Sequence, residues 1–502
     1  MIQIENLTVT HQSDLRDLIK DLNLVVNAGD KLALIGEEGS GKSTLLKLLL
    51  DQQPVENYAL IQGKISNSFE RIGYLPQQLP LQEGEKSIQE YLYQNSNDDF
   101  FDYNLLYRLS EELNLDSQRF DSTQKMSSLS GGEKLKFQLI KMLICDPNLL
   151  LLDEPSNDLD LQSIKWLENF IKRTNKTVIF ISHDEALLSA VATKIVHFEH
   201  VKKKKQAITG VYNYDYQTYK TLRQATFEKN VQLANKEREE HQERIAKLNR
   251  TKSALHHDLN TTKDSTAGRL LAKKMKAIKS QERRFQKTKQ TFTEIPYDTE
   301  RINLSFYDVA PLSASKVVLT YDNQALQKGE GTFPQRISLT IFGQDKVGII
   351  GDNGVGKTTL LKQMWNDLRH RNDLSVGYMP QNYEKELDAK LTPIDFLEEV
   401  ADNQTVKSYL ASLQFTREEI EHPASELSGG QKAKLFLARL VLSQHNVLLL
   451  DEPTRNISPN SQEEIRKLFQ DYQGCIISVS HDRAFLDEVT QKVYELSEKG
   501  IK

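Results

Sequence analysis

The sequence predicts an α/β protein in which two similar domains, each a mainly parallel β-sheet covered by helices, are joined by a long antiparallel helical hairpin. Three observations lead to this prediction. Five short motifs occur twice in the same order, short β-branched and leucine runs alternate with helical periodicity, and a basic insert separates the two copies. At 502 residues, 38% of them hydrophobic, the chain is too long for one ordinary core and has enough apolar material for two domains and a connector.

The repeat consists of five motif pairs. The last three pairs share one offset of 298 residues, which fixes the alignment of the two copies. We therefore expect domains at residues 1–205 and 299–502, separated by a linker at residues 206–298. The pairs are GEEGSGKS (36–43) and GDNGVGKT (351–358), GYLPQ (73–77) and GYMPQ (377–381), LSGGE (129–133) and LSGGQ (427–431), LDEP (152–155 and 450–453), and SHD (182–184 and 480–482).

The linker carries the apolar pattern of two successive helices. From Phe227 to Leu259, most apolar residues recur at alternating steps of four and three, and this seam predicts a helix. If it is continuous from near Tyr216 to Leu259, the helix is about 65 Å long at 1.5 Å per residue. Residues 260–268 interrupt the pattern, and a shorter stripe from Leu271 to Phe285 follows. An antiparallel hairpin with its tip at about residues 255–271 is the simplest arrangement.

The same segment is strongly basic, although the whole chain has a net charge of −5. Residues 201–290 hold 23 Lys plus Arg against 9 Asp plus Glu, a local charge of +14, so the rest of the chain carries −19. This polarised distribution favours contact with a polyanion. The alternative is a solvated coiled coil or spacer whose charges only keep it soluble.

Composition argues against several classes of protein. Apolar runs such as residues 149–152 and 447–450 are far shorter than the roughly 18 residues that cross a bilayer, so we expect no membrane span. The N-terminus lacks the basic region and apolar stretch of a secretory signal, which predicts a cytoplasmic protein. Cys145 and Cys475 fit reduced packing residues better than a disulfide framework.

The first motif pair has the chemistry of a phosphate-binding loop. Glycines let backbone N–H groups point inward, and the following helix presents its positive end to the phosphates. Lys42 and Lys357 are expected to neutralise the β- and γ-phosphates, and Asp153 and Asp451 to hold the shell of a Mg²⁺ ion, so the sequence predicts two ATP·Mg²⁺ sites. Further nucleotide-binding residues are Gly36, Gly39, Gly41, Ser43, Thr44 and Gln77 in the first copy and Gly351, Gly354, Gly356, Thr358, Thr359 and Gln381 in the second, with Ser43, Gln77, Thr358 and Gln381 also expected at the Mg²⁺.

Two residue types beside these aspartates are candidates for catalysis. Glu154 and Glu452 follow them directly and are placed to orient or deprotonate the attacking water. His183 and His481 are expected to contact the γ-phosphate from the next strand end. A single Ser-His pair is usually structural, but its repetition at a fixed distance from the Asp-Glu pair favours a role in catalysis.

With the Leu-Ser-Gly-Gly elements, all five motifs resemble those of the ATP-binding-cassette superfamily, a P-loop NTPase fold, across both domains. The resemblance implies a head-to-tail sandwich, in which the signature motif of one domain completes the phosphate site of the other. It also suggests Tyr321, which aligns with His11, as a platform for adenine, although an ordinary surface aromatic is an equal alternative. The implied signature residues are Ser130, Gly131 and Gly132, over the ATP held by Lys357, and Ser428, Gly429 and Gly430, over the ATP held by Lys42.

Two fused cassettes joined by a basic helical hairpin resemble the ABC-F subfamily of translation factors. The resemblance implies a monomeric, ribosome-associated protein whose partners are the 70S ribosome, its 23S rRNA and the E/P-site tRNA. Residues 211–290 then form the element that enters the tRNA exit site, and the tip approaches the peptidyl-transferase centre. Cationic side chains are expected to contact RNA phosphates. These linker residues are Arg250, Lys252, His256, His257, Lys263, Arg269, Lys273, Lys274 and Lys276.

Departures from the family pattern narrow the subfamily. Residues 454–459 read TRNISP where the family usually has Thr-Asn-His-Leu-Asp, whereas residues 156–160 stay close to it. This departure resembles antibiotic-resistance ABC-F proteins of Gram-positive bacteria, and it predicts unequal hydrolysis, because the altered loop should face the site of Lys42. The glutamine and signature motifs are separated by 52 residues in the first copy and 46 in the second, which leaves no room for an extra arm domain. We also expect no C-terminal extension.

The sequence therefore predicts an ATPase that displaces antibiotics from the peptidyl-transferase centre or the nearby exit tunnel. The resemblance makes lincosamides, pleuromutilins and streptogramin A compounds the leading candidates. One alternative is a housekeeping translation factor that acts on stalled ribosomes without any drug. The other is a cytosolic cassette subunit with a separate membrane partner, for which the hairpin is only a spacer.

Overall fold

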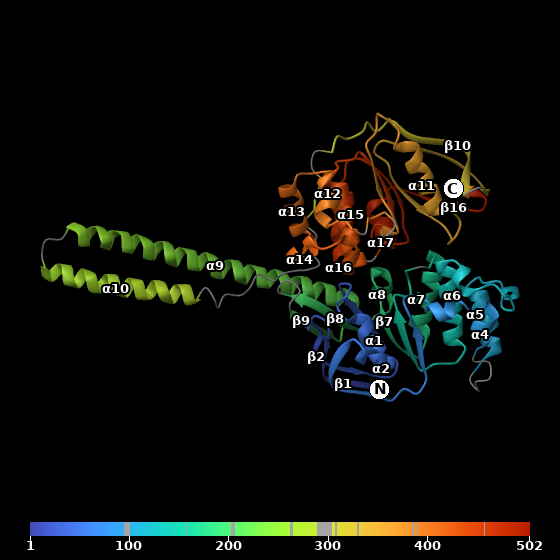
Figure 1. Cartoon of the computed structure of the whole chain (residues 1–502), viewed down its shortest axis with the longest axis horizontal. Helices are drawn as coiled ribbons and strands as arrows, with labels where there is room; N and C mark the ends of the chain where they lie inside the picture. Colours follow the sequence, from blue (N-terminus) through green and yellow to red (C-terminus); the bar gives the residue numbers. More distant parts are fainter. Residues whose placement is uncertain are drawn as a thin grey trace. The chain divides into compact units, whose positions relative to one another are not determined.

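The computed structural model divides into two compact units, one formed by residues 1–216 with 299–502 and the other by residues 217–298 (Figure 1). We call residues 1–216 the first lobe and residues 299–502 the second lobe. The structure describes residues 1–94, 101–157, 159–201, 206–261, 265–288, 304–306, 309–328, 331–383, 386–388, 390–455 and 457–502. Lys263 and the predicted boundaries at 205, 298 and 299 lie outside the described residues.

The first lobe is built on a six-stranded sheet in the order β5-β6-β7-β3-β8-β9. Neighbouring strands are parallel except β8 and β9, which pair antiparallel. Every residue of β3, β6 and β7 is buried, which explains their nearly continuous apolar sequences. The bounds are β3 Lys31–Gly36, β5 Ile72–Leu75, β6 Leu149–Asp153, β7 Thr177–Ile181, β8 Lys194–Val201 and β9 Gln206–Tyr212.

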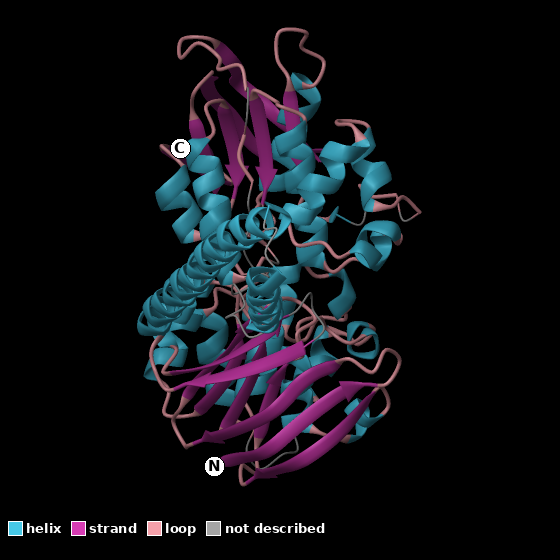
Figure 2. Cartoon of the chain, turned by 90° about the vertical axis from the view of Figure 1, so that its left-hand side faces the viewer, coloured by secondary structure: helices cyan, strands magenta, loops and turns pink. Residues whose placement is uncertain are grey.

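A three-stranded antiparallel sheet, β2-β1-β4, shares a hydrophobic core with the main sheet and with α1. In Figure 2 the strands of the first lobe lie in front of its helices. The remaining bounds of this lobe are β1 Ile2–His11, β2 Asp17–Val26, β4 Ala59–Asn67, α1 Lys42–Leu50, α2 Gln53–Glu56, α3 Leu81–Gly84, α4 Ile88–Tyr93, α5 Tyr103–Glu112, α6 Gly131–Leu143, α7 Leu161–Arg173 and α8 Glu185–Val191.

The second lobe repeats this plan, with a six-stranded sheet in the order β13-β14-β15-β12-β16-β17 and a two-stranded sheet, β10-β11. The strands are β10 Val317–Lys328, β11 Gly331–Phe342, β12 Lys346–Ile350, β13 Val376–Met379, β14 Val447–Asp451, β15 Cys475–Val479, β16 Lys492–Ser497 and β17 Gly500–Ile501. The helices are α11 Lys357–Leu368, α12 Pro393–Glu398, α13 Asn403–Ser412, α14 Arg417–Glu421, α15 Gly429–Leu442, α16 Pro459–Asp471 and α17 Arg483–Val489.

The matching strand orders confirm the predicted pair of mainly parallel α/β sheets, and they explain how distant motifs meet. Strands that run in the same direction end at one edge of the sheet, where ligands of such folds bind. In the first lobe β3 leads into the glycine-rich loop and β6 ends at Asp153. The adjacent strands β5 and β7 lead into Gln77 and His183 at the same edge.

The linker forms two helices, α9 (Tyr216–Thr261) and α10 (Ser265–Thr288), which we call the hairpin. The two helices pack antiparallel, because Lys252 donates to both carboxylate oxygens of Glu282, at 3.0 and 2.9 Å, and His241 Nε2 lies 3.0 Å from the carbonyl oxygen of Phe285. The 46 residues of α9 span about 69 Å at 1.5 Å per residue. None of the helices in the described part of the chain is long and apolar enough to span a membrane.

Burial along α9 follows the apolar seam. Among residues 224–258, the side chains that are not exposed all lie on the predicted seam except Asn230 and Glu237. The predicted break at residues 260–268 is too wide, because residues 260–261 and 265–268 are helical. A glycine inside a helix costs only about 1 kcal/mol relative to alanine, so Gly268 alone does not end the helix.

Candidate functional site

The glycine-rich loops connect β3 to α1 and β12 to α11, and in both the backbone requires glycine. A Cβ atom on Gly36 would lie 2.3 Å from the carbonyl oxygen of Phe198, and one on Gly351 would lie 2.2 Å from that of Leu496. Gly41 and Gly356, directly before the helices, adopt φ values of +97° and +105°. Each loop therefore brings its backbone to the start of a helix, as a phosphate site requires.

The lysines of the two loops are buried within them. Lys42 Nζ donates to the carbonyl oxygens of Gly36 and Glu37, both at 2.7 Å. Lys357 Nζ donates to Gly351 at 2.7 Å and to Asp352 at 3.0 Å, and burial lowers the pKa of Lys357. Thr44 and Thr359 lie in the first turns of these helices and are half-buried. We call the surroundings of Lys42 the first site and those of Lys357 the second site.

A hydroxyl and a carboxylate meet beside each loop. Ser43 Oγ donates to Asp153 Oδ1 at 3.2 Å, and Thr358 Oγ1 donates to Asp451 Oδ1 at 3.3 Å. Burial raises the pKa of both aspartates to about 6. Asp451 Oδ2 is buried and accepts no hydrogen bond from any described residue. These all-oxygen groups fit Mg²⁺, and a cation would offset the burial of the carboxylates. Gln77 and Gln381 lie exposed at the same sheet edges.

The first site holds an ionised glutamate between two side chains. Glu154 has the left-handed φ of +51°, which is uncommon outside glycine and is found where a local structure is held under strain. Its Oε1 lies 3.3 Å from His183 Nε2, and its Oε2 accepts a hydrogen bond from the Asn157 side chain. Burial opposes ionisation, but the charges and hydrogen bonds of His183, Lys42 and Asn157 prevail and lower the pKa of Glu154 to about 2.

The matching glutamate of the second site is in a different state. Glu452 shares the backbone conformation, with φ +55°, and its Oε2 accepts from the backbone N–H of His481 at 3.2 Å. Burial and the neighbouring Asp451 raise the pKa of Glu452 to about 8. Burial and the charge of Lys357 lower the pKa of His481 to about 4. Arg455 stands at the position that corresponds to Asn157.

The signature motifs begin the helices α6 and α15. Ser130 and Ser428 are the N-caps, each in a reciprocal capping box, so the amides of the following glycines point out of the helix start. In the described structure the second signature meets the loop of the first lobe. The backbone N–H of Gly430 donates to Glu38 Oε2 at 2.7 Å, and Lys434 Nζ lies 3.4 Å from Glu37 Oε1.

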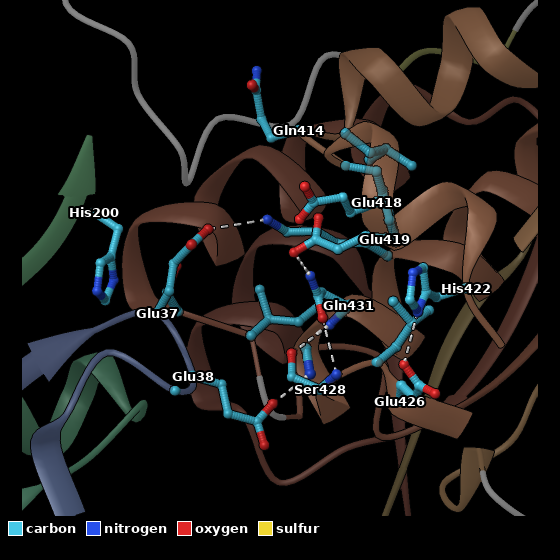
Figure 3. Close-up of a pocket in the computed structure, with 18 of the residues that line it drawn as sticks. Glu37, Glu38, His200, Gln414, Glu418, Glu419, His422, Glu426, Ser428 and Gln431 are labelled. Atoms are coloured by element: carbon cyan, nitrogen blue, oxygen red, sulfur yellow. Dashed lines mark hydrogen bonds and ion pairs between the residues drawn. The ribbon is translucent and has the colours of Figure 1, made fainter. Parts of the chain in front are cut away.

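These contacts border a cavity of about 460 Å³ between the first glycine-rich loop and the start of α15 (Figure 3). In Figure 3 Glu38 reaches toward the start of α15 beside Ser428. The carboxylate of Glu38 thus accepts a hydrogen bond from an amide of the kind that binds a phosphate oxygen. The carboxylate must move away before a phosphate can bind to that amide. Ile457 and Ser458 line the same cavity, so the altered loop faces the first site, as we expected.

The corresponding loop of the first lobe acts on the second site. Asp160 lies close enough to Lys357 and His481 for its charge to raise the pKa of each, against the larger effect of burial. Each lobe therefore places its loop after the Asp-Glu-Pro motif near the glycine-rich loop of the other lobe. Ser130, Gly131 and Gly132 occupy the matching start of α6, where Ser130 is exposed.

The structure corrects the interpretation of Tyr321. Its ring is buried in the core between β10 and α11, and its hydroxyl donates to Asp367 at 2.6 Å. A side chain fixed in this way cannot present its face to an adenine. His11 is half-exposed, with Nδ1 3.0 Å from Asp14 and its ring 6.3 Å from that of Tyr58.

Among the expected linker cations that the structure describes, one is placed differently from the others. Lys252 is half-buried in the hairpin seam, where it pairs with Glu282, so the expectation that it faces RNA is corrected. It lies at a seam position of α9, and its long side chain reaches the carboxylate on α10. The exposed members of the expected set are Arg250, His256, His257, Arg269, Lys273, Lys274 and Lys276.

Sequence reasoning missed the residues that distinguish the two sites. Glu37 and Glu38 occupy positions of the glycine-rich loop for which the motif chemistry sets no residue type, and Lys434 lies three residues beyond the signature motif, so no local pattern predicts their contacts. Asn157 could have been found by aligning the two copies, because Arg455 replaces it at the corresponding position, three residues after the glutamate.

Comparison with known proteins places these sites in context. The ABC transporter family model matches residues 19–157 and 334–455, more than half of the chain. The chain is 30% identical over 523 residues to the ribosome protection protein VmlR of Bacillus subtilis, covering 100% of this chain and 88% of that protein. It is 26% identical to ABC transporter F family member 5 of Arabidopsis thaliana, covering 99% and 75%. Its fold matches the archaeal ribosome recycling factor aABCE1 with a TM-score of 0.62 at 16% identity, covering 99% and 89%.

Proposed function

The chain belongs to the ABC-F subfamily of ATP-binding-cassette ATPases, and from this membership we propose that it is a ribosome protection protein that displaces antibiotics from the peptidyl-transferase centre. The observation that best supports this proposal is the similarity to VmlR. It extends over 100% of this chain and so includes the hairpin as well as both proposed ATP sites. The exposed cations on the hairpin support the proposal, because they suit contact with RNA phosphates.

In this proposal each site hydrolyses ATP with residues of both lobes. Lys42 holds the phosphates in the first site, and the amides after Ser428 cap the γ-phosphate once Glu38 has moved away. A Mg²⁺ held by Ser43, Asp153 and Gln77 would neutralise charge on the β- and γ-phosphates. The second site uses Lys357, Thr358, Asp451 and Gln381, with Ser130, Gly131 and Gly132 supplied by the first lobe.

Glu154 and Glu452 are the proposed general bases. The water oxygen bonds to the γ-phosphorus, its proton passes to the glutamate, and the bond from that phosphorus to the ADP oxygen breaks. His183 and His481 donate to the γ-phosphate. Because the phosphate links the two lobes, its loss removes a bridge between them and allows the lobes to separate.

We propose domains at 1–205 and 299–502, with 206–298 as the linker that carries this change to the ribosome. The cytoplasmic protein would bind the tRNA exit site as a monomer, and the tip at about residues 255–271 would contact 23S rRNA or the E/P-site tRNA. Lincosamides, pleuromutilins and streptogramin A compounds are the proposed drugs. The similarity to ABC transporter F family member 5, whose name carries no protection role, extends over 99% of this chain and supports a second candidate, a housekeeping translation factor.

A ribosome-trapping experiment tests both candidates. A Glu154→Gln, Glu452→Gln chain binds ATP without hydrolysing it, so it should sediment with 70S ribosomes when ATP is present. The matched control carries Lys42→Ala and Lys357→Ala in addition and should stay in the supernatant. A double glutamine variant that remains in the supernatant with ATP contradicts both ribosomal functions.

A drug panel separates protection from housekeeping. A strain without the gene should become more susceptible to at least one of the three proposed drug classes, and the wild-type gene should restore resistance. The double glutamine variant is the matched control and should not restore it. Unchanged susceptibility across the panel rejects protection and leaves the housekeeping function.

Replacement of the tip separates the hairpin from the ATPase. A chain with residues 255–271 replaced by a short Gly-Ser turn should lose protection and keep its basal ATPase rate, because the tip is remote in sequence from every ATPase motif. A milder variant changes Lys273, Lys274 and Lys276, which follow the tip on α10, to Gln. Lys252→Gln is the control, because Lys252 is already paired with Glu282. Loss of basal ATPase with the Gly-Ser turn would instead make the hairpin a folding element.

A further inference from the structure

Beyond the glycine-rich loops and the signature motifs, two ion pairs join the lobes. Arg483 Nη2, at the start of α17, lies 2.8 Å from Glu168 Oε2 on α7. Arg466 Nη2, on α16, lies 3.0 Å from Glu185 Oε2 at the start of α8. Figure 1 shows α17 next to α8, with α16 and α7 beside them. We call these four residues the charge quartet.

The internal repeat shows that these two pairs are one contact made twice. With the offset of 298 residues, Glu168 corresponds to Arg466 and Glu185 corresponds to Arg483. Each pair therefore joins the same two positions, one from each lobe, as an interface around a pseudo-two-fold axis would. The charges do not follow this symmetry. Both acids come from the first lobe and both bases come from the second.

Burial makes the arrangement costly to break. The side chain of Arg466 is 2% exposed and that of Glu185 is 13% exposed, whereas the Arg483–Glu168 pair is about one quarter exposed. Arg466 also lies 2.9 Å from Glu488 of its own lobe, at a position where the first lobe has Ala190. A buried guanidinium held by two carboxylates loses much more when it faces another cation than an exposed one does.

We infer that the charge quartet is a recognition code that makes the first lobe pair with the second lobe and prevents each lobe from pairing with a copy of itself. The lobes share their fold and motifs, so like lobes from two molecules compete for the same interface. Such a contact between first lobes would gather four carboxylates, and one between second lobes would gather four guanidinium groups. Repulsion between like charges is an effective way to exclude a wrong partner.

The position of the quartet gives this code a consequence for the ATPase. Glu185 and Arg483 lie two residues after His183 and His481, so the helices that pair are those that follow the two histidine loops. Correct pairing therefore sets how the two sites face each other. This inference goes beyond the proposed function, because it concerns how the sandwich is assembled, whatever the ATPase acts on.

Charge reversal in the full-length chain tests the code. One variant carries Glu168→Arg and Glu185→Arg, a second carries Arg466→Glu and Arg483→Glu, and a third carries all four changes. Each double variant should lose steady-state ATPase activity by about tenfold or more, because buried like charges then meet. The quadruple variant restores both ion pairs with exchanged signs, so its ATPase rate should stay within about threefold of the wild-type rate. Charge reversal at the exposed Glu421, which pairs with Arg417 within α14, is the matched control and should leave the ATPase rate unchanged.

Mixing the two double variants provides a second readout. The first lobe of one chain then complements the second lobe of the other, so an equimolar mixture should form a two-chain particle by sedimentation velocity and regain ATPase activity. The quadruple variant contains all four charge reversals, so its activity also shows that these substitutions permit folding. Three outcomes would each overturn the inference. The double variants could keep the wild-type ATPase rate, the quadruple variant could be as inactive as they are, or the mixture could stay monomeric and inactive.

Discussion

In the first site Glu154 is held ionised between His183 and Asn157, whereas in the second site Glu452, with the same backbone conformation, has its pKa raised to about 8 by burial and by Asp451. The two glutamates follow identical Leu-Asp motifs. Both are buried, so their difference comes from the groups around them. The charge and hydrogen bond of His183, with smaller contributions from Lys42 and Asn157, outweigh burial at Glu154, whereas burial and Asp451 prevail at Glu452. Motif identity fixes where the carboxylate lies, and its neighbours fix the direction in which its pKa is shifted.

The loops after the Asp-Glu-Pro motifs repeat this lesson. Lys136 pairs with Asp160 of its own lobe at 3.4 Å. The corresponding Lys434 has Ser458 at that place, and it pairs with Glu37 of the other lobe instead, also at 3.4 Å. The difference between Asp160 and Ser458 thus turns a contact within a lobe into a contact between lobes. Of these two lysines, only Lys434 makes the contact between lobes, and it does so at the first site.

The largest expected effect is a difference between the single glutamine variants. At pH 7 a base with a pKa of about 8 is ionised in only about one tenth of the molecules, so the first site should carry most of the turnover. We expect Glu154→Gln to lower the steady-state ATPase rate by about tenfold at pH 7, and Glu452→Gln to lower it by less than about twofold. Equal losses would show that the protonation difference does not control the rate.

The pH dependence of those variants sharpens the comparison. A general base acts when ionised, so a raised pKa makes activity low below that pKa and restores it as the pH increases. In the Glu154→Gln chain the remaining ATPase rate should rise about tenfold from pH 7 to pH 9, through the pKa of Glu452. In the Glu452→Gln chain it should stay nearly constant over this range, because the pKa of Glu154 is about 2. A flat profile in both chains contradicts the assignment.

A smaller effect is expected from Ser458→Asp, which gives Lys434 the partner that Lys136 has. Lys434 would then release Glu37, and the contact that closes the first site without nucleotide would weaken. We expect ATP affinity to increase about threefold, within the range measured for single ion pairs. Binding is measured in the Glu154→Gln, Glu452→Gln background. Ser458→Asn is the control, and the same gain with this neutral side chain would exclude the ion-pair explanation.

The smallest effect concerns the helix caps of the same loops. Asp160 accepts from the backbone N–H of Ser163 at 2.8 Å as the N-cap of α7, whereas Ser458 makes no such bond at the start of α16. Asp160→Ala should cost about 1 kcal/mol and lower the melting temperature of the first lobe by about 2 °C in calorimetry. Ser458→Ala should shift it by less, and an equal or larger shift would mean that capping does not distinguish the loops.

The sequence alone determined the two α/β lobes, the mainly parallel character of their sheets, the glycine-rich loops and the two helices of the hairpin. These features rest on local periodicity, on glycines with a conformation other residues avoid, and on a repeat that fixes the alignment. Tertiary structure alone decided that Tyr321 is buried, that Lys252 pairs with Glu282, that Glu38 meets Gly430 and that burial raises the pKa of Glu452. The physical reason is that burial and the approach of charges distant in sequence depend on how elements pack, which no local pattern records.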